Sequence, residues 1–136
     1  MINEKQMNSL FLDAEKVSVF AYAPYSKFRV GAALLCEDGS VVTGVNVENR
    51  SFGLTICAER NAVCKAISLG KLNFTALAIS TPDSAEPVGP CGACRQVLGE
   101  FLAPDTPVRF AGSNGKTVNT TMGELLPFDS LHELRD

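Results

Sequence analysis

The sequence contains no tryptophan, only two tyrosines and a single histidine among its 136 residues. That histidine, His132, lies in the charged C-terminal tail, where we expect an exposed side chain, so the sequence argues against a metal site built on histidine. Basic residues are also scarce, because 12 Lys and Arg face 15 Asp and Glu and the formal net charge is −3. Proteins that bind nucleic acids normally carry a basic patch for the phosphates and aromatic side chains that stack on bases. We therefore expect no nucleic-acid partner and favour a small uncharged substrate.

Hydrophobic runs long enough to span a bilayer are missing as well, and Met1 to Asp13 carry charges throughout, unlike a secretory signal. We therefore expect a cytoplasmic protein without a membrane partner. With 46% hydrophobic and 20% charged residues, the composition is typical of a globular chain with a core, and we expect one domain spanning residues 1–136. Structural disulfides are rare in a reducing compartment, so the five cysteines favour metal binding.

Three of these cysteines stand in two short motifs, Thr55–Arg60 and Pro90–Cys94. Cys57, Cys91 and Cys94 together would supply three thiolates, which leaves the fourth position of a tetrahedral zinc open for water or substrate, as in catalytic sites. Glu59 follows Cys57 by two residues, close enough to reach that water but poorly placed to bind the same metal. This pattern predicts a catalytic zinc centre in which Glu59 transfers protons.

The remaining cysteines, Cys36 and Cys64, bear on the alternatives to this site. A Cys-x-x-Cys pair alone is a weak signal, which redox motifs and structural zinc sites share. A structural zinc would need a fourth ligand, but Cys36 and Cys64 lie in apolar patterns that predict core side chains. A redox role would leave Cys57 and Glu59 without a function, so we favour the catalytic centre.

Hydrophobic spacing and turn signals predict helices alternating with strands, and hence a layered sheet. The predicted helices cover 3–21, 57–69, 91–102 and 121–126, and the predicted strands cover 28–35, 40–47, 74–80, 108–111 and 116–120. Asp38-Gly39 predicts a turn between the first two strands, which we expect to pair antiparallel. Cys57 and Cys91 would then lie at helix N-termini, where the helix dipole favours the thiolate.

Two arginines follow the cysteine motifs. Three thiolates around Zn²⁺ leave a net charge of −1, and Arg60 is one helical turn from Cys57, so we expect it to donate hydrogen bonds to the ligand sulfurs. For Arg95 the sequence leaves open a similar role or a contact with a neighbouring chain.

Both cysteine motifs resemble those of a known family. Cys57–Arg60 and Pro90–Gln96 are similar to the two zinc motifs of the small cytidine deaminases. Ala21–Phe28 and Gly44–Asn49 resemble that family's nucleoside-binding segments, and Glu124–Pro127 resembles its C-terminal signature. The resemblance covers nearly the whole chain in matching order.

This resemblance implies an α/β fold with three layers, α/β/α, around a mixed five-stranded sheet, and a homotetramer with one Zn²⁺ per chain on Cys57, Cys91 and Cys94. It implies hydrolytic deamination of cytidine and 2′-deoxycytidine to the uridine compounds, with release of ammonia, in pyrimidine salvage. Glu59 would take a proton from water and deliver protons to N3 and then to the departing amine.

Five further residues would bind the substrate if the resemblance holds. Phe28 would stack on the base, Asn46 and Glu48 would hold the sugar hydroxyls, and the Ala58 backbone would read the base edge. From pattern alone, a strand-core aromatic is the default interpretation of Phe28. Asn46 and Glu48 fit a polar strand face in water as well as they fit sugar binding. Phe128 would cap a neighbouring chain's pocket, although it directly follows Pro127 without the family's usual short spacer.

Rival functions differ in their residues. A deaminase of another cytosine compound, such as a nucleoside antibiotic, would lack Phe28, Asn46 and Glu48 as a set. A nucleic-acid-editing deaminase would carry basic and aromatic surface segments. A noncatalytic zinc module would not need Glu59.

Overall fold

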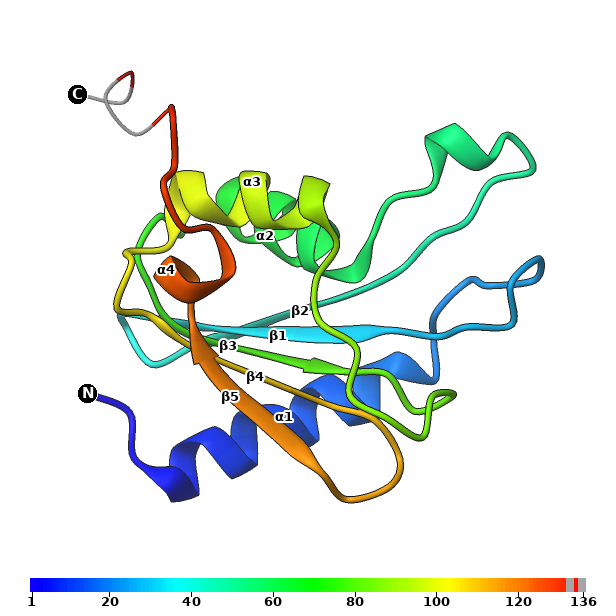
Figure 1. The fold of residues 1–136 in the computed structure, drawn as a ribbon, viewed down its shortest axis with the longest axis horizontal. Coiled ribbons are helices and arrows are strands. Elements are labelled where there is room, and N and C mark those ends of the chain that lie inside the picture. Colours follow the sequence, from blue (N-terminus) through cyan, green and yellow to red (C-terminus); the bar gives the residue numbers. More distant parts are fainter. Residues whose placement is uncertain (132–133, 135–136) are drawn as a thin grey trace.

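A five-stranded sheet forms the centre of the computed structural model, which describes residues 1–131 and 134 (Figure 1). In chain order the elements are α1 (Glu4–Ser18), β1 (Gly31–Cys36), β2 (Val41–Val45), the 3₁₀ turn η1 (Phe52–Leu54), α2 (Ala58–Ser68), β3 (Phe74–Ser80), α3 (Gly92–Phe101), β4 (Pro107–Ala111), β5 (Thr117–Thr121) and α4 (Met122–Leu125). The strand order is β2-β1-β3-β4-β5. β3 and β4 pair parallel, with α3 as the crossover between them, and the other neighbouring strands of the sheet pair antiparallel, so the predicted mixed sheet is confirmed.

Helices cover both faces of this sheet, with α1 on one side and α2 and α3 on the other (Figure 1). Alternate residues of the strands point to opposite faces. On β1, Ala33 packs in the cluster with Leu10 and Ala14 of α1, whereas Leu34 packs in the larger cluster with α2 and α3. The predicted three-layer α/β/α fold is therefore confirmed.

Gly44 on β2 is a point where the backbone of α2 lies close against the sheet. A Cβ at this position would lie 2.4 Å from the Ala62 nitrogen and 2.6 Å from the Ala58 carbonyl oxygen. Nearby, Asn61 Nδ2 donates to the Val45 carbonyl at 2.7 Å. These contacts place the first turn of α2 against the end of β2.

The first helix ends earlier than the sequence predicts. Asn3 caps it, with Gln6 completing the capping box, but α1 stops at Ser18 rather than continuing to residue 21. Tyr22 instead pairs with the chain beyond β2: its N–H donates to Asn46 O and its carbonyl accepts from the N–H of Glu48. An extended pairing at the edge of the sheet therefore replaces the last turn that the sequence predicts for this helix.

Strand boundaries also shift, because β1 begins at Gly31 rather than at residue 28, and β2 ends at Val45. The Asp38-Gly39 turn is confirmed, with Gly39 at φ +88°. Cys36 is buried as predicted, but the prediction for Cys64 is wrong: it lies on the exposed side of α2, opposite the face that Ala62 and Ala66 bury. The expectation for His132 falls outside the described residues.

Within the part of the chain that the structure describes, no helix combines the length and apolar character needed to cross a membrane.

Replacing Gly44 by alanine should lower the free energy of unfolding by about 1–3 kcal/mol, because the added methyl group must push α2 away from β2. Denaturant unfolding measures this change. Gly53→Ala is the matched control, since a Cβ there meets no atom within 4 Å. Equal midpoints for the two variants would contradict the close packing described for Gly44.

Candidate metal centre

Three cysteine side chains from two helices converge on one point. Cys57 is the N-cap residue of α2, Cys91 is the N-cap residue of α3, and Cys94 lies in the first turn of α3. Their Sγ atoms all lie within 4.8 Å of one another, and those of Cys57 and Cys91 are 4.0 Å apart. Neither N-cap thiol accepts a capping hydrogen bond, so both are available to a ligand. The predicted helix N-termini are confirmed.

The spacing and chemistry of these sulfurs fit a zinc ion. Zn–S bonds of about 2.3 Å in a tetrahedron place two sulfurs about 3.8 Å apart, close to the observed Cys57–Cys91 separation of 4.0 Å. Thiolates are ligands that zinc prefers. All three cysteines are free of disulfides, and three ligands leave a fourth position open.

The thiol of Cys57 has an unusual environment. Its pKa is lowered to about 5, chiefly by a hydrogen bond with the Cys94 side chain and further by the guanidinium of Arg60. The same Cys57–Cys94 interaction, together with burial, raises the pKa of Cys94. Cys57 therefore becomes a thiolate more readily than Cys94, at a helix end whose dipole favours negative charge.

Glu59 lies beside these sulfurs in the first turn of α2 and is 4% exposed. Burial raises the pKa of its carboxyl group to about 7, and the negative charge of Cys57 acts in the same direction. A carboxyl group with this pKa exchanges protons readily near neutral pH. Ala58, the preceding residue, is fully buried.

The two arginines of the motifs have different contacts. Arg60 Nη2 donates to Cys57 Sγ at 3.3 Å, as the sequence predicts. Its Nε is, among the described residues, the one buried side-chain nitrogen or oxygen without a hydrogen-bond partner. Arg95 contacts its own chain: Nε donates to the Pro90 carbonyl at 2.8 Å and Nη1 to the Leu125 carbonyl at 3.1 Å. It thus fixes the backbone next to Cys91.

Asn46 and Glu48 lie just beyond β2 and both face the segment 25–30. Asn46 is 7% exposed, so it does not form the water-facing strand surface that pattern alone allows. Its Nδ2 donates to the Phe28 carbonyl at 2.8 Å, and its Oδ1 accepts from the Val30 N–H at 2.9 Å. The Glu48 carboxylate accepts from the N–H groups of residues 25 and 26 and from the Ser26 hydroxyl.

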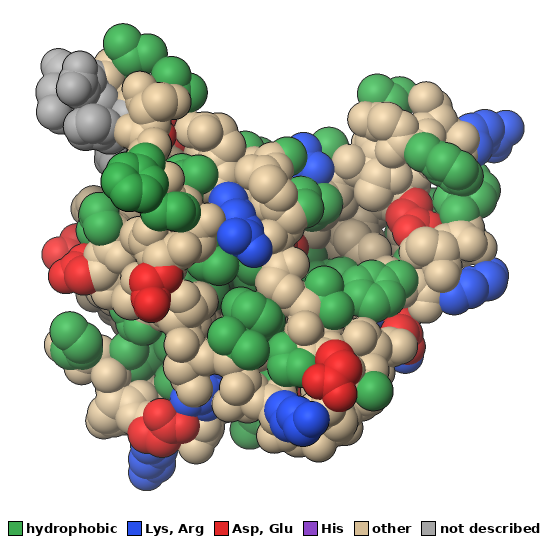
Figure 2. All heavy atoms as spheres, viewed as in Figure 1, with side chains coloured by type: hydrophobic (Ala, Val, Ile, Leu, Met, Phe, Trp, Pro, Cys, Tyr) green, Lys and Arg blue, Asp and Glu red, His purple; other side chains and the backbone are tan. Residues whose placement is uncertain are grey.

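This segment is connected to the metal centre through the backbone. Val47, between Asn46 and Glu48, exchanges two hydrogen bonds with Ile56, the residue before Cys57. The chain between them, with η1, extends beyond the sheet, and Figure 2 shows the surface hollowed between this arm and the body of the molecule. Phe28 is half-buried and precedes β1 instead of lying within a strand.

Phe128 is fully exposed and lies far from the sulfurs of its own chain. It lines a groove with Gly99 and Leu102 at the C-terminal end of α3, whereas Cys91 begins that helix. Figure 1 likewise shows the chain after α4 running along the other end of α3. The structure therefore brings Glu59 and Arg60 to the three cysteines but does not bring Phe128 there.

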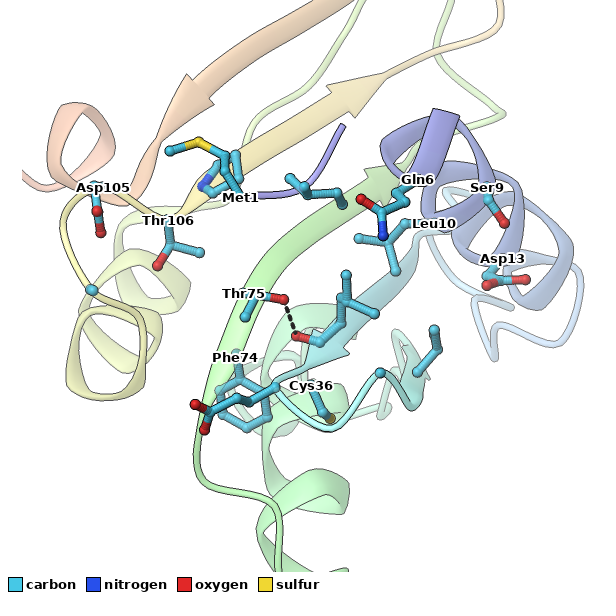
Figure 3. A pocket seen from close by; sticks show the side chains of 17 residues that line it. Met1, Gln6, Ser9, Leu10, Asp13, Cys36, Phe74, Thr75, Asp105 and Thr106 are labelled. Atoms are coloured by element: carbon cyan, nitrogen blue, oxygen red, sulfur yellow. Dashed lines mark hydrogen bonds between the residues drawn. The ribbon is translucent and has the colours of Figure 1, made fainter. Parts of the chain in front are cut away.

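A large cavity lies elsewhere in the molecule. It measures about 720 Å³ and lies between the start of α1 and the ends of the central strands (Figure 3). Its lining includes Asp13, Thr75 and Asp105 but none of the three clustered cysteines. Size alone therefore does not mark the site; the convergence of thiols and a buried carboxyl group does.

Comparisons with known proteins agree with this geometry. Residues 4–109 match the family model of the cytidine and deoxycytidylate deaminase zinc-binding region. A cytidine deaminase of Halalkalibacterium halodurans is 48% identical over 124 residues, covering 91% of this chain and 92% of that protein. A blasticidin-S deaminase of Bacillus cereus is 34% identical over 133 residues, covering 93% and 92%.

A solved structure is similar over the same range. The crystal structure of cytidine deaminase from Burkholderia pseudomallei superposes with a TM-score of 0.85 at 41% identity, covering 93% of this chain and 98% of that one. The sulfur cluster, the fold around it and these matches lead to one conclusion: the chain belongs to the cytidine deaminase family of zinc-binding enzymes.

Proposed function

We propose that this chain, as a single deaminase domain over residues 1–136, hydrolytically deaminates cytidine and 2′-deoxycytidine to uridine and 2′-deoxyuridine, releasing ammonia. The observation that carries this proposal is a buried Glu59, with a pKa of about 7, next to the sulfurs of Cys57, Cys91 and Cys94. One zinc ion per chain, held by these sulfurs, supplies a water that is nucleophilic near neutral pH.

Glu59 moves the protons of the reaction. Its carboxylate takes a proton from the attacking water as the new C–O bond forms at C4 of the cytosine ring, and it delivers this proton to N3. It then takes the remaining proton of that water from the new hydroxyl at C4 and delivers it to the amino group, so that C4=O forms, the C4–N bond breaks and ammonia leaves. A pKa close to the working pH allows one group to act as base and acid in turn. Arg60 offsets the negative charge of the thiolates through its contact with Cys57.

The remaining residues place the nucleoside. Phe28 stacks on the base, and the Ala58 backbone at the start of α2 reads its edge. Asn46 and Glu48 bind the sugar hydroxyls. Oε1 of Glu48 accepts two backbone hydrogen bonds and Oε2 accepts one from the Ser26 hydroxyl, so Oε2 has room for a further bond from a sugar hydroxyl.

Assembly into a homotetramer completes the pocket. Phe52, Leu54 and Phe128 are 73%, 64% and 101% exposed, an arrangement that supports burial against other copies of the chain. Phe128, remote from its own cysteines, reaches the pocket of a neighbouring subunit. The cellular setting that we propose is pyrimidine salvage in the cytoplasm.

The proposed activity is tested by incubating zinc-loaded protein with cytidine, 2′-deoxycytidine, cytidine monophosphate and blasticidin S, and following the loss of ultraviolet absorbance. We expect turnover of the two nucleosides only, because a chain with a formal net charge of −3 favours an uncharged substrate over a phosphorylated one. Turnover of blasticidin S alone would replace this proposal with antibiotic deamination, the activity named for the relative of Bacillus cereus.

Replacing Glu59 by glutamine should lower kcat by about 10²–10⁴-fold, because the amide cannot carry the proton. Zinc content should stay at the wild-type value, since Glu59 is not a ligand. Glu15→Gln, at an exposed position of α1, is the control and should retain full activity. Undiminished turnover by the Glu59 variant would remove the proton-transfer role.

Replacing Cys94 by serine should reduce bound zinc well below one ion per chain, because a neutral hydroxyl replaces a buried thiolate ligand. Metal analysis after dialysis against a chelator measures the loss. Cys64→Ser, on the exposed side of α2, is the matched control and should keep its zinc. Equal zinc contents would mean that Cys94 is not a ligand.

A further inference from the structure

The segment that carries Phe28 has little regular structure of its own. Residues 27–30 belong to no helix or strand. Lys27 has φ +61°, in the left-handed region that side chains other than glycine rarely adopt. A backbone of this kind keeps one conformation only where its surroundings hold it.

Polar side chains from outside the segment fix its backbone through hydrogen bonds. Glu48 binds the turn at residues 25 and 26, and Asn46 binds the backbone on both sides of Arg29. The third residue that binds this segment is Asp83, which is 54 positions away from Arg29 in the sequence and in a different loop. No sequence pattern predicts the contact between Arg29 and Asp83, or the contact of Ser26 with Glu48.

Asp83 contacts Arg29 at three atoms. Its Oδ2 accepts from both the backbone N–H and Nε of Arg29, each at 2.9 Å, and its Oδ1 accepts from Nη2 at 2.8 Å. These bonds lower the pKa of Asp83 to about 2, so it is ionised throughout the physiological range. Because the backbone N–H of Arg29 takes part, the carboxylate fixes the main chain directly after Phe28 as well as the side chain.

Backbone hydrogen bonds fix the turn that carries Asp83. Thr81 N–H donates to Ala111 O at the end of β4, and Ser84 N–H closes a turn onto Thr81. The carbonyl of Ser84 then accepts from Ser113 N–H at 2.8 Å and lies where a Cβ on Gly112 would clash, at 2.3 Å. This turn begins the same loop that ends at Pro90 and Cys91.

We infer that Asp83 is a positioning residue, which acts through Arg29 to hold Phe28 at a fixed place relative to the metal centre. This inference rests on the proposed function, because it assigns Phe28 to the nucleoside base. Half-exposed ion pairs contribute little to stability, and the side chains of Arg29 and Asp83 are 42% and 26% exposed. The importance of the pair therefore lies in the geometry that it imposes on the segment and not in the free energy of unfolding.

Steady-state kinetics of Asp83→Ala with cytidine test this role. We expect KM to rise roughly tenfold, since misplacing a binding group by about 1 Å is enough for a larger loss. We expect kcat to change by less than about twofold and zinc content to stay constant. Glu86→Ala is the matched control: Glu86 lies in the same loop and pairs with Lys116, away from the Phe28 segment. Asp83→Asn, which keeps one oxygen acceptor, should fall between wild type and Asp83→Ala.

A double-mutant cycle separates positioning of Phe28 from a general structural effect. In a Phe28→Ala background, Asp83→Ala should change KM by less than about twofold, the range expected when the coupled partner is already gone. Independent, multiplying effects in the double variant, or a KM for Asp83→Ala equal to that of Glu86→Ala, would overturn the inference.

Amide hydrogen exchange tests the same hold without any activity. Peptides covering residues 25–30 should exchange faster in Asp83→Ala than in wild type or Glu86→Ala. Unchanged exchange overturns the inference whatever the kinetics. Wild-type protein that does not convert cytidine would instead refute the proposed function, while the exchange experiment would still decide whether Asp83 holds the segment.

Discussion

Two helices that begin at one point are the constraint on which the rest of the site depends. Cys57 caps α2 and Cys91 caps α3, so two sets of free backbone N–H groups face the same cluster of sulfurs. These helix ends stabilise negative charge on the thiolates, in addition to the contact between Arg60 and Cys57. Two residues near the site support this arrangement of the helices. Gly44 lets α2 lie close against β2, and Arg95 fixes the backbone at the start of α3.

Glu59 gains its chemistry from the same arrangement. It occupies the first helical turn, where the dipole favours a carboxylate, but burial among the core residues of α2 and the charge of Cys57 raise its pKa. Burial is the larger effect, so the pKa of the carboxyl group rises to about 7. A surface glutamate in the same turn would be fully ionised and a poorer proton donor.

The local parts of this design could be predicted from the sequence. Cysteine and glutamate spacing identified the cluster, and Asp38-Gly39 identified the hairpin, because these signals depend on neighbouring residues. The predicted burial of Cys64 is wrong. Cysteine side chains tend to be buried, but residue 64 lies on the far side of α2, which faces solvent. The helix end at Ser18 and the Arg29–Asp83 pair depend on contacts between segments distant in the chain, for which a single sequence carries no signal.

The order of the sheet also has a consequence for how the protein matures. Cys57 and Cys91 are 34 positions apart, and the residues between them include β3, the strand that lies between β1 and β4. In the folded chain the sulfurs meet because β3 lies in the sheet and α3 crosses back over it. Closure of this long loop is a slow, non-local event during folding. A chain that has not inserted its central strand therefore lacks the complete three-sulfur ligand set, and full affinity for the metal ion requires the assembled sheet.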